Sequence, residues 1–246
     1  MIEEELSILR SRVVEEFCGV MEFKAFTDFA YLMSSGAAAA NADTGGGAVL
    51  GYADFGPYLG VPNRTVEMRD IPRHIQAAKD GYFLALVHQH QVALFEHILF
   101  DVLRVVLLNQ PIRLPSDRKI EYSVIVSAPS KAEILQAMVD RELNELKYKN
   151  VSDWFSYMGK LVSSLAVPAD DVGRIAEAKA ARDLIVHNGG IVNDTYIRKS
   201  GAQARFDVGQ PVNVAGTYTL ECWQVFSRVL IDLIDKFQST LVRGDG

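Results

Sequence analysis

The sequence predicts a mainly α-helical protein, and three observations carry this prediction. Apolar residues recur at helical spacing over long stretches, most clearly in residues 74–110 and 217–242. Segments with strand-like alternation are few and short. The chain of 246 residues is 49% hydrophobic and 23% charged, which is enough apolar material to bury a core. We expect a helical bundle with short extended segments over residues 76–246. Residues 1–75 are expected to form an N-terminal helical extension and a Gly/Ala-rich loop.

The N-terminal third predicts helix, loop and helix in that order. Residues 2–32 carry apolar side chains at helical spacing and predict one helix or a broken pair. Residues 34–62 are rich in Ala, Gly, Asn and Pro and predict a long loop; its triple glycine lacks the ending of a phosphate-binding loop. The long helix that follows is expected to kink near Gly81 and to stop before Pro111.

The middle of the chain predicts a short connector and then a capped helix. Residues 120–127 are β-branched and partly alternating, so they predict a short strand or an extended connector. Ser130 and Glu133 have the spacing of a capping box and predict the start of a helix that runs to about residue 146.

The last part of the chain predicts three more helices. Ser152 or Asp153 is expected to cap a helix that runs to about residue 165, and another helix is expected to start near Asp170 or Asp171. Residues 190–215 predict mostly loop with short extended pieces, and an apolar-striped helix closes the chain.

Charge and cysteine content narrow the class of protein. A formal net charge of -6 argues against coating of nucleic acid or an anionic membrane by charge alone, although it leaves room for a local basic cleft. Cys18 and Cys222 lie far apart and lack metal or redox spacing. The N-terminus is acidic, and no run approaches the ~18 apolar residues of a membrane span. We therefore expect a cytoplasmic protein without a membrane partner.

One stretch, AKAARDLIVHNGGIVND at residues 178–194, contains the candidate catalytic residues. Asp183 and His187 are four residues apart and share a helix face, so the carboxylate can hydrogen-bond the imidazole and fix its tautomer. The sequence Asn188-Gly189-Gly190 then predicts the helix end, where the partial negative charge of the helix favours an imidazolium.

Arg182 gives the same helix end a cation. It lies about 140° around the helix from His187, but its long stem can bring the guanidinium toward a phosphate held there. RNA cleavage by 2′-hydroxyl attack needs a base, an acid and positive charge at the phosphate, and needs no metal. Each chain supplies one such His, so a symmetric dimer would supply both proton-transfer groups. The alternative is a helix end with a dipole-matched His and a surface Arg–Asp pair.

The pattern Arg, polar residue, three residues and His on a late helix resembles the signature of the HEPN superfamily. Its members are largely metal-independent ribonucleases of toxin–antitoxin systems, phage defence and RNA processing. The resemblance covers about residues 80–243 and is closest to the larger bacterial HEPN-like proteins. It implies a HEPN-like helical bundle, a homodimer, RNA as substrate, neither cofactor nor metal, and an antitoxin or regulatory protein as a further partner.

The resemblance also implies roles for individual residues. Arg182 contacts the phosphate, Asp183 positions the motif, and His187 is the acid or base. Asn188 orients the His or binds ribose, or it is only the helix C-cap. Glu96, on the long helix, either pairs with Arg182 inside the bundle or lies at its edge in solvent.

The chain departs from the family pattern at one position near the motif. HEPN toxins that are neutralised by AMPylation carry a Tyr two residues after the His, where this chain has Gly189. The next tyrosine is Tyr196, which makes that kind of neutralisation doubtful.

Other residues have both a functional and a structural interpretation. Arg198 and Lys199 follow the motif and suit a phosphate track, or they belong to a solvated loop. His90 and His97 lie two turns apart, roughly 10 Å, which is too far for one metal ion. Trp154 and its aromatic neighbours are expected in the core, with base stacking as the alternative.

Three functions are consistent with these residues. The first is a dimeric, metal-independent endoribonuclease of toxin or phage-defence type, with residues 34–50 covering its cleft or sensing a signal. The second is a non-catalytic HEPN-like module that binds a nucleotide or a protein. The third is a helical scaffold without a site.

Overall fold

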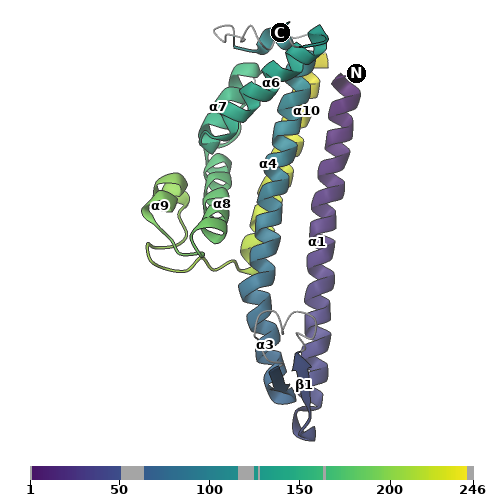
Figure 1. Cartoon of the computed structure of the whole chain (residues 1–246), viewed down its shortest axis with the longest axis vertical. Coiled ribbons are helices and arrows are strands. Elements are labelled where there is room, and N and C mark those ends of the chain that lie inside the picture. The colour runs from purple at the N-terminus through teal and green to yellow at the C-terminus, as the bar shows by residue number, and fades with distance from the viewer. Residues whose placement is uncertain (1, 51–63, 116–124, 127, 163–164, 243–246) are drawn as a thin grey trace. The chain divides into compact units, whose positions relative to one another are not determined.

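The computed structural model describes residues 2–50, 64–115, 125–126, 128–162 and 165–242, and these residues are mainly helical (Figure 1). The helices are α1 (Ile2–Ala40), α3 (Ile71–Ala78), α4 (Leu84–Asn109), α6 (Lys131–Lys147), α7 (Val151–Leu161), α8 (Ala169–His187), α9 (Asp194–Ser200) and α10 (Gly216–Val242). The strands β1 (Gly47–Leu50) and β2 (Arg64–Glu67) pair antiparallel.

The chain divides into two compact units. Unit 1 comprises residues 1–18, 88–212 and 216–246, and unit 2 comprises residues 19–87 and 213–215. The boundary predicted at residue 75 falls inside unit 2. None of the described helices is both long and apolar enough to cross a membrane.

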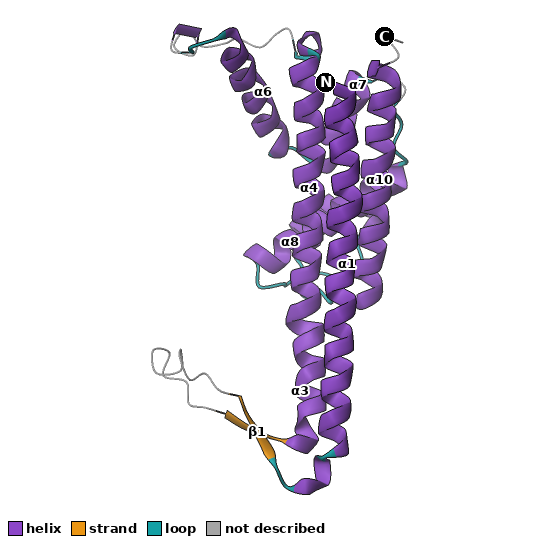
Figure 2. Cartoon of the chain, turned by 90° about the vertical axis from the view of Figure 1, so that its right-hand side faces the viewer, coloured by secondary structure: helices purple, strands orange, loops and turns teal. Residues whose placement is uncertain are grey.

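The core of unit 1 lies where α1, α4 and α10 run alongside one another (Figure 2). The rings of Phe95 and Phe226 stack with centroids 4.8 Å apart, and the side chains of Leu6, Leu103 and Leu230 are fully buried. Each such side chain contributes roughly 1.5–3 kcal/mol to folding. The apolar faces of these helices therefore form the core, as their periodicity predicts.

Helix ends confirm one predicted cap and correct another. The Ser130 hydroxyl accepts a hydrogen bond from the Glu133 amide at 3.3 Å and starts α6 as predicted. The next predicted cap, Ser152 or Asp153, is wrong by two or three residues, because α7 starts at Val151 and Asn150 is its N-cap. Asp153 completes this cap, since its Oδ2 accepts a hydrogen bond from the Asn150 backbone amide at 3.1 Å. That helix also ends four residues earlier than expected, at Leu161.

The aromatic residues of α7 belong mainly to the core. Trp154 and Phe155 are buried, and the Trp154 indole N–H donates to the Leu146 carbonyl at 2.8 Å. The core interpretation of these two residues is confirmed. The predicted strand or connector at residues 120–127 lies outside the described residues, apart from residues 125–126, which are helical.

The segment after the motif is more ordered than the sequence predicts. Residues 194–200 form α9, and a 3-10 turn follows at residues 201–203. The side chain of Asn193 caps α9 by accepting from the Tyr196 amide at 3.0 Å. Seven residues are too few for apolar periodicity to predict a helix. The prediction of mostly loop is therefore wrong for this part.

Unit 2 corrects the prediction of a loop from residue 34. The alanine-rich residues 34–40 continue α1, which agrees with the high helix propensity of alanine. Residues 47–50 form β1, whereas residues 51–63 lie outside the described part of the chain. Near Gly81, where a kink is expected, residues 79–83 form a π-helical turn.

Candidate functional site

The motif lies at the end of α8, and the helix stops as its sequence predicts. Gly189 and Gly190 have φ of 60° and 74°, a left-handed conformation that favours glycine. The amides of Asn188 and Gly190 both donate to the Leu184 carbonyl, at 2.8 and 2.9 Å. The Asn188 side chain donates to the Ile191 carbonyl at 2.6 Å, so it ties down the turn that follows the helix.

Arg182 is half-buried and held by Glu96, which agrees with the interpretation that Glu96 pairs with Arg182 rather than lying in solvent. Its Nη2 donates to Glu96 Oε2 at 2.7 Å, which links α8 to α4. Lys179, one turn earlier on α8, places Nζ 2.5 Å from the other oxygen of Glu96. A half-buried carboxylate is stabilised by such pairing, and here two cations share it.

Asp183 does not orient His187. In the part of the chain that the structure describes, its carboxylate pairs with Arg182 at 3.5 Å and with Lys199 at 3.4 Å. The predicted hydrogen bond between Asp183 and His187 is therefore wrong, because α9 brings Lys199 to the same carboxylate. The His187 side chain is exposed at the last residue of α8.

Five side chains thus form one charged group, which we call the motif cluster: Glu96, Lys179, Arg182, Asp183 and Lys199. Three cations share two carboxylates, so the cluster keeps one positive charge in excess. Arg198 does not join the cluster; it is exposed, and its guanidinium donates to the Thr195 hydroxyl at 3.3 Å. A local excess of positive charge attracts anionic groups such as phosphate.

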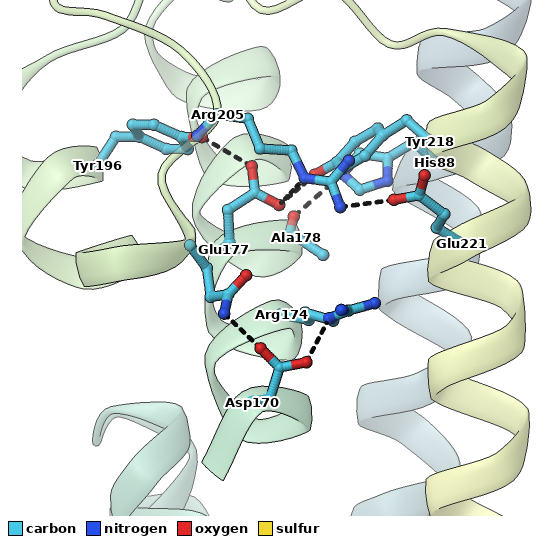
Figure 3. A network of polar contacts seen from close by, with 10 residues as sticks. His88, Asp170, Arg174, Glu177, Ala178, Tyr196, Arg205, Tyr218 and Glu221 are labelled. Carbon is cyan, nitrogen blue, oxygen red and sulfur yellow. Dashed lines mark hydrogen bonds and ion pairs between the residues drawn. The ribbon is translucent and has the colours of Figure 1, made fainter. Parts of the chain in front are cut away.

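A second polar group surrounds the buried carboxylate of Glu177, on α8 (Figure 3). Tyr196 donates to Glu177 Oε1 at 2.7 Å, and Tyr218 donates to Oε2 at 2.8 Å. Arg205 Nε lies 3.7 Å from Oε2, and the Arg205 amide donates to the Tyr196 hydroxyl at 3.0 Å. This Glu177 network ties α9 and the following segment to α8 and α10.

Burial controls the protonation of this network. It raises the pKa of Glu177, while the hydrogen bonds from Tyr196 and Tyr218 and the charge of Arg205 act in the opposite direction. Burial and the charge of Glu177 raise the pKa of Cys222 to about 12. A thiol with such a pKa stays protonated near neutral pH, so Cys222 is not poised as a nucleophile.

His88 belongs to the core. Its ring is fully buried 5.0 Å from the Tyr218 ring, and Nε2 donates to the Ala178 carbonyl at 3.0 Å. Burial is the largest of the causes that lower the pKa of His88 to about 4. Across the described residues, no three His, Cys, Asp or Glu side chains gather as they would around a metal ion.

Searches with this chain find no matching protein-family model, curated protein or solved structure. The functional assignment therefore depends on the chemistry of the residues described above. Sequence reasoning missed Lys179 and the Glu177 network. The spacing of Lys179 and Arg182, three residues apart on one helix, was the available signal for the first; nothing local indicates the second.

Proposed function

We propose that this protein is a metal-independent endoribonuclease of HEPN type that acts in the cytoplasm as a homodimer. The observation that supports it is the ion pair between Glu96 and Arg182, which fixes a cation on the helix that ends at the exposed His187. A held cation and an exposed imidazole on one helix are the groups that this reaction uses.

In the proposed reaction, the ribose 2′-oxygen attacks the adjacent phosphorus and the 5′-oxygen leaves. His187 of one copy takes the 2′-hydroxyl proton, and His187 of the other copy gives a proton to the departing oxygen. Arg182 and the remaining charge of the motif cluster stabilise the crowded phosphate. The products are a 2′,3′-cyclic phosphate and a 5′-hydroxyl end. A toxin or phage-defence role, with an antitoxin or regulatory partner, belongs to this proposal.

Lys179 supports this proposal because it can keep Glu96 paired when Arg182 contacts substrate. If Arg182 turns toward a phosphate, Glu96 would lose a partner in a half-buried site, which is costly for a carboxylate. Lys179 already contacts the other oxygen of Glu96 at 2.5 Å and would keep that charge paired. We infer that Lys179 allows Arg182 to exchange Glu96 for substrate.

A second candidate is a non-catalytic module of the same type that binds a nucleotide or a protein. It is favoured by the ion pair of Arg182 with a second carboxylate, that of Asp183, at 3.5 Å. The described chain also has no hydrogen bond between His187 and the Asp183 carboxylate, which favours the second candidate because no carboxylate then orients the imidazole.

RNA cleavage in EDTA tests the first proposal. Labelled total RNA is incubated with wild type, His187→Ala, Arg182→Lys and the control His90→Ala, whose side chain is exposed on α4. We expect wild type and His90→Ala to leave 2′,3′-cyclic phosphate ends, and the two motif variants to lose at least about 100-fold in rate. Equal cleavage by wild type and His187→Ala would refute the role of His187. A wild type that binds RNA without cleaving it would favour the second candidate.

A further inference from the structure

The part of α1 that lies in unit 2 presents an apolar face to solvent. Phe26, Phe29 and Met33 are 73%, 60% and 57% exposed. The nearby charged residues Lys24 and Asp28 lie on the other side of the helix, where they pair at 2.7 Å. Large apolar side chains that gather on one face at this exposure indicate a contact surface.

The spacing along this face is that of a helix-pairing stripe. Phe26, Phe29, Met33, Gly36 and Ala40 follow one another at intervals of three, four, three and four residues, which is the heptad pattern of paired helices. We call these five residues the α1 stripe. A Cβ added at Gly36 would meet no atom within 4 Å, so the surface above the small residues is open.

We propose that the α1 stripe is an interface between two copies of this chain, with the two helices antiparallel. The stripe is bulky at its Phe26 end and small at its Gly36 and Ala40 end. An antiparallel pair places the bulky end of each copy against the small end of the other, so the volumes match. One surface then serves both copies, as a two-fold axis requires.

The exposed area of the α1 stripe is large enough for an interface with a second copy of the chain. At ~200 Å² for a whole aromatic side chain, the stripe with Phe23 and Leu32 at its margins exposes roughly 600 Å² per copy. Two copies would bury roughly 1,200 Å², the lower limit of a stable protein interface. An anionic membrane surface fits less well. Helices that lie on membranes carry Lys and Arg on their polar face, whereas this chain has a net charge of -6 and Lys24 pairs with Asp28.

Analytical ultracentrifugation of the full chain over a range of concentrations tests this interface. We expect a dimer for wild type, and a dimer Kd raised about tenfold or more in Phe26→Glu and Gly36→Glu, because each would bury an unpaired carboxylate. The matched control is Ile8→Glu, which is on the same helix at 61% exposure but outside the stripe and should keep the wild-type Kd. Circular dichroism checks that the variants stay helical.

Three results would overturn the proposal: a monomeric wild type, Phe26→Glu dimers as tight as wild type, or an equal loss in Ile8→Glu. A monomeric wild type that binds phosphatidylserine vesicles through Phe26 would assign the stripe to a lipid surface. Mixing Phe29→Lys with Gly36→Glu tests the antiparallel order, because these two positions face each other in such a pair and the opposite charges should restore pairing in the mixture. The stripe contains no motif residue, so its interface is separate from the contact between two His187 side chains that the proposed reaction needs. Dimers of Phe26→Glu as tight as wild type would overturn the stripe and leave the ribonuclease proposal standing, whereas a monomeric wild type would count against both.

Discussion

Acid should destabilise this protein through one buried histidine, His88. In the folded state its pKa is about 4, because burial opposes the charged form, whereas an unfolded histidine has a pKa of about 6.5. Between these two pKa values, the unfolded chain therefore binds a proton on His88 that the folded chain does not bind. The stabilising contribution of neutral His88 is present above about pH 6.5 and is lost as the pH falls toward 4.

The size of the effect follows from the two pKa values. Each unit of difference corresponds to about 1.4 kcal/mol, so the full loss is about 3 kcal/mol, with about 2 kcal/mol of it between pH 7 and pH 5. His88→Gln keeps an amide donor for the Ala178 carbonyl but does not titrate. Other titrating groups are common to both proteins, so the difference between their pH profiles isolates His88.

Urea unfolding of wild type and His88→Gln at several pH values measures this difference. We expect the wild type to lose about 2 kcal/mol more unfolding free energy than the variant between pH 7 and pH 5. Parallel profiles, within about 0.5 kcal/mol, would show that the folded protein accepts a proton on His88 without penalty. The inference that burial dominates at this site would then be refuted.

Two further predictions concern the Glu177 network and the end of α8. Tyr196→Phe removes a hydrogen bond to the buried carboxylate of Glu177 and should lower the unfolding free energy in urea by about 2–3 kcal/mol. The control Tyr148→Phe, at an exposed residue, should change the unfolding free energy by less than about 0.5 kcal/mol. Similar effects of the two variants would contradict this role of the network. Gly190→Ala should lower the unfolding free energy by about 1 kcal/mol, because φ at this residue is 74°. Gly19→Ala, in a helix with open space around it, should raise the unfolding free energy by about 0.5–1 kcal/mol. Thermal unfolding compares the two, and a gain in both variants would contradict the strain at residue 190.

Local properties of the chain determined most of the helices. The 3.6-residue periodicity of α4 and α10, the Ser130 cap and the glycine stop after His187 depend only on neighbours within a few residues. Such signals are present in the sequence itself. The contact between Glu96 and Arg182 was one of the two interpretations that the sequence left open, because a carboxylate among apolar residues requires a partner only if it is buried.

Only the tertiary structure decided which charges meet around the motif. The sequence pairs Asp183 with His187, four residues away, but the folded chain brings Lys199 to that carboxylate from α9. Glu177 meets Tyr218 across 41 residues of sequence, and no periodicity predicts such a meeting. Helix spacing fixes which side chains share a face, whereas packing of separate segments fixes what that face contacts. The sequence therefore determined most of the helices and the motif, and the fold determined the partners of the motif.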